Sequence, residues 1–167
     1  MGRKEDLLIM LMEKRVGFKA DEVMSGTHRF VGGAGPVGEL PFEFKVTWGP
    51  RRLGKFLNPL DADFMLSDLA GTVTVGGLCD DASCEGRLEF RYVEEAKIRY
   101  IFDFDAGGKR YHYVGEKRDL RPWNLHKTHT TCYGTLTEAD TGKVVSESTT
   151  YFRLSTAIPF MLSFRWG

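Results

Sequence analysis

The sequence predicts an all-β protein of about eight antiparallel strands, arranged as a meander and curled into a barrel. Apolar and polar residues alternate along several segments, turn-forming sequences join these segments in pairs, and glycines recur near the predicted strand starts. Alternation with a period of two is typical of a strand with one buried face, and such half-buried strands form antiparallel sheets. The same strands also allow an open β-sandwich, which is the alternative architecture.

The alternation is clearest in three segments, 41–48, 87–92 and 97–104. In each of them every second residue is apolar, and the positions between are mostly charged or polar. The apolar sets are Phe42, Phe44, Val46 and Trp48; Leu88, Phe90 and Tyr92; and Ile98, Tyr100, Phe102 and Phe104. Each set places a continuous apolar stripe on one face of its strand.

Four turns connect the predicted strands into hairpins. Segment 106–108 (Ala-Gly-Gly) and segment 139–142 (Ala-Asp-Thr-Gly) carry strong turn signals, and the glycine-rich segment 31–36 is a third turn. Residues 80–83, between Cys79 and Cys84, are predicted as the fourth. A meander of eight strands has two exposed edges, and closure into a barrel removes both of them.

Glycines at four related positions support the barrel over the sandwich. Gly26, Gly71, Gly86 and Gly134 each follow two residues of a predicted strand and precede a threonine or arginine. A glycine inside a strand relieves crowding at a sharp bend, and barrel corners require such bends.

The two ends of the chain have their own patterns. Residues 1–20 predict a short N-terminal helix, because the apolar run 7–12 is flanked by charged residues. That run is far shorter than the roughly 20 residues of a membrane span, and no signal-peptide cleavage site follows it, so we expect a cytoplasmic protein. Residues 21–167 form the single barrel domain, with segment 51–68 as a lid and the apolar segment 157–166 as a plug or docking patch.

Composition excludes several classes of function. The formal net charge of zero argues against a nucleic-acid partner, and we interpret the basic pairs Arg51–Arg52 and Lys117–Arg118 as solvated surface charge. Three cysteines, an odd count, favour free thiols, although a hairpin at 80–83 leaves a Cys79–Cys84 pair open. The chain carries no phosphate-binding, hydrolase or zinc-binding motif, so we expect no cofactor and no metal.

Aromatic and histidine side chains are the candidates for a ligand site. Strand aromatics could line an apolar pocket in which tyrosine hydroxyls supply the polar contacts, or they could fill a solid core. His126 and His129 lie in a predicted loop at the barrel mouth, where an imidazole could act as an acid or base or simply satisfy backbone groups. The candidate ligand-binding residues are Trp48, Tyr100, Phe102, Tyr111, Tyr113, Trp123, His126 and His129.

Segments 24–27, 41–48, 68–75, 97–104 and 113–117 together resemble an accessory β domain of bacterial cholesterol-oxidase-like flavoproteins, in the glucose-methanol-choline oxidoreductase group. The resemblance spans residues 22–155. It implies a standalone version of that domain, related to lipid or sterol metabolism, with a flavin oxidoreductase as partner. The dinucleotide-binding glycine motif is absent, so the chain itself should not bind FAD, and no catalytic residue is carried over. The strand count also resembles lipocalin-like barrels.

Three functions follow from these observations. The first, which we expect, is a non-catalytic module that binds a small hydrophobic molecule, lipid-like or sterol-like. The second is a docking protein for a flavoenzyme, which would use segment 160–166. The third is a small isomerase or hydrolase that would use His126 or His129 together with a tyrosine.

Overall fold

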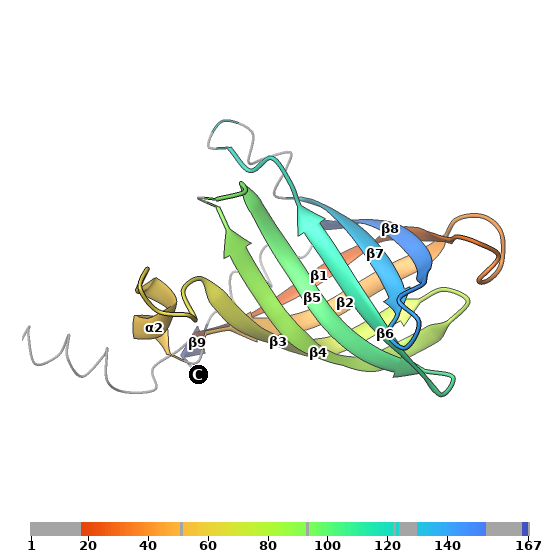
Figure 1. Ribbon diagram of the computed structural model, residues 1–167, viewed down its shortest axis with the longest axis horizontal. Coiled ribbons are helices and arrows are strands. Elements are labelled where there is room, and N and C mark those ends of the chain that lie inside the picture. Colours follow the sequence, from red (N-terminus) through yellow and green to blue (C-terminus); the bar gives the residue numbers. More distant parts are fainter. Residues whose placement is uncertain are drawn as a thin grey trace, which may run out of the picture.

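The computed structural model shows a closed barrel of eight antiparallel strands (Figure 1). It describes residues 18–50, 52–92, 94–121, 123, 130–152 and 165–166. The strands are β1 (Phe18–Phe30), β2 (Leu40–Gly49), β3 (Leu66–Val75), β4 (Cys79–Arg91), β5 (Lys97–Ala106), β6 (Lys109–Lys117), β7 (Thr131–Glu138), β8 (Val144–Phe152) and the two-residue β9 (Arg165–Trp166).

The order of the strands confirms the predicted meander. Each strand from β1 to β8 pairs with the next one in the chain, and β8 then pairs with β1 from Met24↔Phe152 to Phe30↔Ser146. This last pairing closes the barrel and rules out the open sandwich. β9 adds a short pairing with the start of β1.

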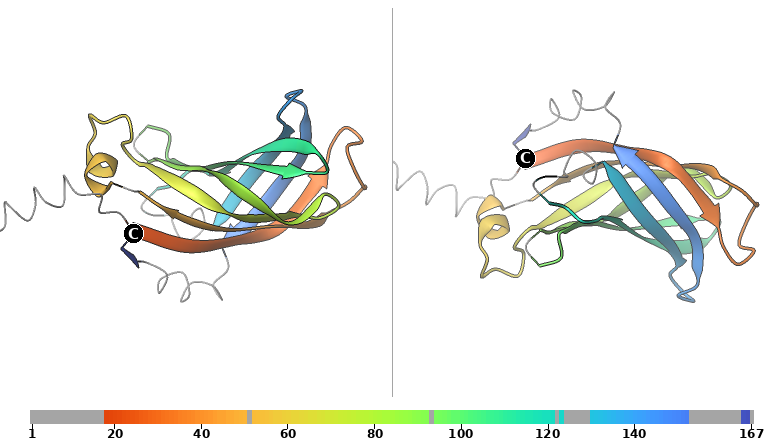
Figure 2. Two further views of the ribbon diagram at one scale, coloured as in Figure 1. Left: turned by 90° about the horizontal axis from the view of Figure 1, so that it is seen from below. Right: turned by 90° about the horizontal axis from the view of Figure 1, so that it is seen from above.

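The two ends of the barrel differ (Figures 1 and 2). The connections between β1 and β2, β3 and β4, β5 and β6, and β7 and β8 all lie at one end, which we call the turn end. The predicted turn at 106–108 is confirmed there, since Gly107 and Gly108 both have positive φ, +57° and +79°. The opposite end, which we call the mouth, carries the longer connection from β2 to β3 with helix α2 (Leu53–Leu57).

One predicted turn is wrong. The chain reverses at Gly76–Leu78, where Gly77 has φ +81°, and residues 80–83 belong to β4. The pairing of β3 with β4 shifts its register between Val73 and Val75, opposite the start of β4, as at a β-bulge. Cys79 and Cys84 therefore lie on one strand, and both are free thiols, as is Cys132.

Glycines at the barrel bends have a steric role, as predicted. A Cβ atom at Gly71 would overlap the carbonyl oxygen of Lys45 on the neighbouring strand, and one at Gly86 would overlap that of Ile101. Adjacent strands therefore approach so closely that only a hydrogen atom fits between them. The sharp coiling of β3 and β4 depends on this contact.

Aromatic rings fill the lumen between its middle and the turn end. Phe44 is fully buried, and its ring centroid lies 5.5 Å from that of Phe102 and 5.7 Å from that of Tyr113. Tyr113 in turn stacks on Phe102 at 4.6 Å and on Phe42 at 5.3 Å. This half of the lumen is a packed core of aromatic rings.

His28 seals the core at the turn end. Its Nε2 lies 2.8 Å from the carbonyl oxygen of Gly76, and its Nδ1 lies 2.8 Å from the Ser146 hydroxyl. A carbonyl only accepts, so Nε2 carries the hydrogen and Nδ1 accepts from Ser146. Burial lowers the pKa of His28 below its usual 6.5, which favours this neutral imidazole.

The buried histidine predicts a loss of stability in mild acid. When the pH falls from about 7.5 to about 5.5, the unfolded chain takes up a proton at this position before the folded barrel does. The stabilisation is fully present well above pH 6.5 and is lost as the pH falls through 6.5 toward the lowered pKa of the folded state, by at most about 1.4 kcal/mol per pH unit for one proton. Urea unfolding of wild type and His28→Gln at several pH values measures this difference. The variant should lose part of the pH dependence; an unchanged pH dependence would contradict this prediction.

Parts of the predicted ends lie outside the described residues. This holds for residues 1–17 of the predicted N-terminal helix and for most of segment 157–166; Phe18–Ala20 belong to β1. Among the residues that the structure describes, no helix is long and apolar enough to cross a membrane.

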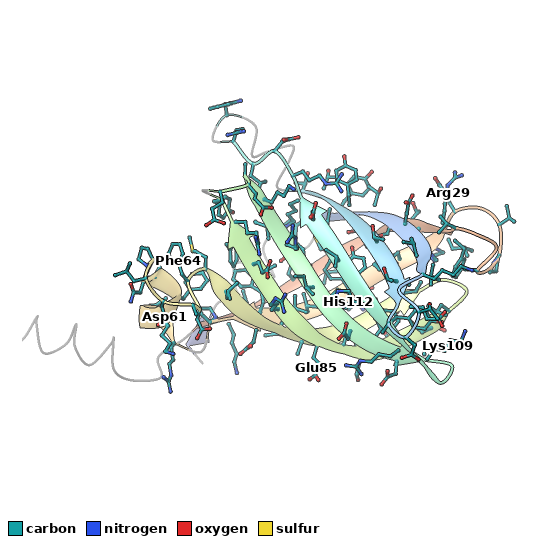
Figure 3. The ribbon with its side chains drawn as sticks, in the orientation of Figure 1. Arg29, Asp61, Phe64, Glu85, Lys109 and His112 are labelled. Atoms are coloured by element: carbon teal, nitrogen blue, oxygen red, sulfur yellow. The ribbon has the colours of Figure 1, made fainter. Side chains whose placement is uncertain are left out.

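The outer wall is polar (Figure 3). His112 and Glu85 project from it. Glu89 is almost completely buried and forms ion pairs with Arg87 and Arg91 of the same strand. Burial acts to raise the pKa of Glu89, but hydrogen bonds of 2.9 Å from Arg87 and Arg91 outweigh it and lower that pKa. These charges cover the sheet and leave the lumen as the apolar region.

Candidate ligand-binding site

A cavity of about 350 Å³ occupies the mouth end of the lumen. Six strands of the barrel (β1, β2, β4, β5, β6 and β8) contribute to its wall, which is largely apolar and rich in aromatic rings. It is lined by Glu22, Trp48, Leu88, Phe90, Tyr92, Ile98, Tyr100, Lys117, Thr130 and Phe152. The barrel is therefore filled at its turn end and hollow at its mouth.

The floor of this cavity is a carboxylate held by three donors. Glu22 accepts hydrogen bonds from Lys117 Nζ to Oε1 at 3.0 Å and from Trp48 Nε1 to Oε2 at 3.1 Å. The Tyr100 hydroxyl donates to both oxygens, at 3.0 and 3.1 Å. The side chains of Glu22 and Lys117 are each only 5% exposed, so this ion pair is almost completely removed from water.

Strand parity brings Glu22 and Lys117 into the lumen. Glu22 is in β1 two residues before the fully buried Met24, so both point inward. In β6, Lys117 follows Tyr113 by four residues and shares its face. The two charged residues are 95 positions apart in the chain, and barrel closure alone makes them neighbours.

This placement corrects the interpretation of Lys117 as solvated surface charge. The residue lies in a run of charged residues, which usually marks a solvated face, but it is the last inward-facing position of β6. Glu22 was not predicted as a site residue at all. Their positions in the alternation could have identified both residues. Glu22 lies two residues before Met24 and Lys117 lies four residues after Tyr113, so each falls on the inward-facing side of its strand.

Burial keeps the phenol of Tyr100 in its protonated form. It raises the pKa of Tyr100 well above its usual value, and the negative charge of Glu22 raises it further, so the phenol remains a donor. In the core beside Tyr113, burial raises the pKa of the Cys132 thiol to about 11. A protonated, fully buried thiol is a poor nucleophile.

The structure separates the predicted site residues. Trp48 and Tyr100 line the cavity. Phe102 and Tyr113 lie below it in the packed core, and Tyr111 stacks on Phe104 toward the turn end at 5.6 Å. Trp123 is 76% exposed. His126 and His129 lie outside the described residues, and within the described part of the chain no cluster of side chains could hold a metal ion.

A larger hollow of about 600 Å³ lies outside the lumen, between the α2 connection and the edges of β3 and β4. Charged side chains such as Arg52, Lys55 and Asp63 line it. Lys55 and Asp63 are 44% and 61% exposed, and they form an ordinary surface ion pair at 3.7 Å. The mouth cavity, with its desolvated charged floor, is therefore the stronger candidate site.

The fold and the site define the class of this protein: a closed, eight-stranded antiparallel barrel with a polar-floored cavity in its mouth. No protein-family model, curated protein or solved structure matches the chain. The resemblance to accessory domains of cholesterol-oxidase-like flavoproteins, and the flavin oxidoreductase partner that it implies, therefore stay predictions.

Proposed function

We propose that the barrel binds one small, mainly apolar molecule in its mouth cavity. The observation that carries this proposal is a cavity with apolar walls that ends on the buried Glu22–Lys117 pair. Its volume falls in the range of small-molecule sites, roughly 300–1,000 Å³, which combine apolar walls with a few polar groups that orient the ligand.

The energetics of the floor support a role in recognition. A buried ion pair loses so much hydration that well-packed apolar residues would often stabilise a protein as well or better. The neighbouring inward positions of the mouth are apolar or aromatic, for example Leu88 and Ile98. A carboxylate and an ammonium at this depth thus contribute little that the fold needs, and they supply the orienting groups that a binding site needs.

The volume of the cavity limits the size of the ligand. An engineered cavity of about 150 Å³ accommodates benzene, so by proportion this one holds about 14 non-hydrogen atoms. A sterol has about twice that number and would enter with only one end, whereas a bicyclic aromatic compound or a short amphiphile would fit entirely.

Titration with naphthalene tests the proposal, alongside native mass spectrometry and organic extraction of gently purified protein. We expect one naphthalene per chain, detected as a shift of the Trp48 indole N–H resonance. Ile98→Phe places a larger side chain into the cavity wall and should weaken binding at least about tenfold, because the volume left for the ligand decreases.

Ile101→Phe is the matched control. Ile101 lies on the same strand but has the opposite parity, and it points to the outer face. This variant should bind naphthalene like the wild type. Equal weakening by both substitutions, or no binding of naphthalene to the wild type, would contradict the proposal.

A further inference from the structure

The polar groups of the cavity floor differ in the hydrogen-bonding capacity that they leave unused. The Tyr100 hydroxyl and the Trp48 indole each direct their hydrogen to Glu22. Both carboxylate oxygens of Glu22 are already bonded. The Tyr100 oxygen can still accept a hydrogen bond, but neither Tyr100 nor Trp48 has a hydrogen left to donate to a ligand.

Lys117 is the exception. Its ammonium carries three N–H donors, and among the described residues its hydrogen-bond partner is Glu22 alone. The ammonium also lies 5.3 Å from the centre of the Tyr100 ring, at the edge of the cavity. Two donors of a side chain that is 95% buried are thus available to a molecule inside the cavity.

The charges in the cavity also restrict which hydrogen-bond acceptor a ligand can present to Lys117. Among the described residues that line the cavity, Glu22 and Lys117 are the charged ones, and they neutralise each other. An anionic ligand would bring a second negative charge close to Glu22, and the described part of the lining offers no further cation to balance it. An uncompensated charge at such a depth is strongly disfavoured, so an uncharged oxygen is the better partner.

The walls indicate the shape of the rest of the ligand. Trp48, Phe90 and Tyr92 form a connected group of rings on one side, with centroids 5.4 Å apart for Trp48 and Phe90 and 6.2 Å apart for Phe90 and Tyr92. Tyr100 and Phe152 add two more aromatic side chains to the lining. Such walls favour flat, unsaturated molecules, which stack on them.

From these contacts we infer that the ligand is a flat, uncharged molecule with one acceptor oxygen, such as a ketone carbonyl, which Lys117 binds while Glu22 holds the ammonium in place. This inference rests on the proposed function, since it assumes that the mouth cavity is the binding site. Lys117 is then the residue that determines specificity, and Trp48 and Tyr100 orient the carboxylate behind it.

Three probes with the same number of non-hydrogen atoms test the inference on the wild-type protein: 2-acetylnaphthalene, 2-isopropenylnaphthalene and 2-naphthoate. Their dissociation constants are measured from the Trp48 indole N–H resonance. The ketone should bind about tenfold more tightly than the hydrocarbon, because a hydrogen bond to a charged donor has a net value of that order. It should also bind at least about tenfold more tightly than the carboxylate.

A charge-neutral variant provides the matched control. Glu22→Gln combined with Lys117→Met removes both charges together, and should reduce the preference for the ketone over the hydrocarbon to less than about threefold. Equal binding of ketone and hydrocarbon to the wild type would overturn this inference and leave the proposed function standing. Tightest binding of 2-naphthoate would overturn the requirement for an uncharged ligand. Failure of all three probes to bind would overturn the proposed function itself.

Discussion

Lys117→Met is expected to lower the free energy of unfolding by about 3–5 kcal/mol. The substitution leaves the carboxylate of Glu22 buried beneath apolar walls with no cation beside it. Tyr100 and Trp48 still donate to that carboxylate but do not balance its charge. Urea unfolding followed by far-ultraviolet circular dichroism measures the loss.

Two further variants show whether burial causes this effect. The double variant Glu22→Gln with Lys117→Met should be more stable than Lys117→Met alone, because no unpaired charge remains. Arg29→Met breaks the surface pair with Glu39, whose side chains are 66% and 57% exposed, and should cost less than about 1 kcal/mol. A loss for Lys117→Met no greater than that of Arg29→Met would show that the floor is hydrated.

Phe44→Ala is expected to cost about 3–5 kcal/mol through the cavity that it leaves in the packed half of the lumen. Phe44 is fully buried, and its ring lies against Tyr100 at 5.4 Å as well as against Phe102 and Tyr113. The surrounding strands are hydrogen-bonded on both sides in a closed barrel, so they cannot move inward to fill the space. Chemical unfolding at constant m-value measures the loss.

Phe44→Leu and Val37→Ala are the comparison variants for the stability loss of Phe44→Ala. Leucine retains much of the buried volume and should cost less than alanine. Val37 is fully exposed in the β1–β2 connection, and its replacement should change stability by no more than about 0.5 kcal/mol. A small effect of Phe44→Ala would mean that the turn end of the lumen adjusts freely, contrary to the packing described above.

Much of the fold could be predicted because its signals are local. Alternation identifies the inward face of strands such as β2, which contains Phe42, and β5, which contains Phe104. Paired glycines such as Gly107–Gly108 identify turns. Where two turn signals compete, local reasoning fails. Gly76–Gly77 and the run 80–83 lie only a few residues apart, and the chain turns at the glycines, where Gly77 adopts positive φ without strain.

The candidate site was only partly predictable. Trp48 and Tyr100 belong to clear apolar stripes and were found, but Glu22 and Lys117 look like surface charges in polar surroundings. Charged residues are rarely buried, so a sequence argument assigns them to solvent by default. Their burial is possible only because each provides the other's partner, and that partner lies 95 positions away.

The sequence by itself determined the all-β class, the meander, and the face of each strand that turns inward, because these depend on period-two patterns and on turn residues. The tertiary structure decided three things: that β8 returns to β1, that aromatic rings fill the turn end while the mouth stays hollow, and that Glu22 meets Lys117, Tyr100 and Trp48 on the cavity floor. Alternation states which side chains point into the lumen. Which of them meet across it depends on strand stagger and closure, and these are properties of the whole barrel.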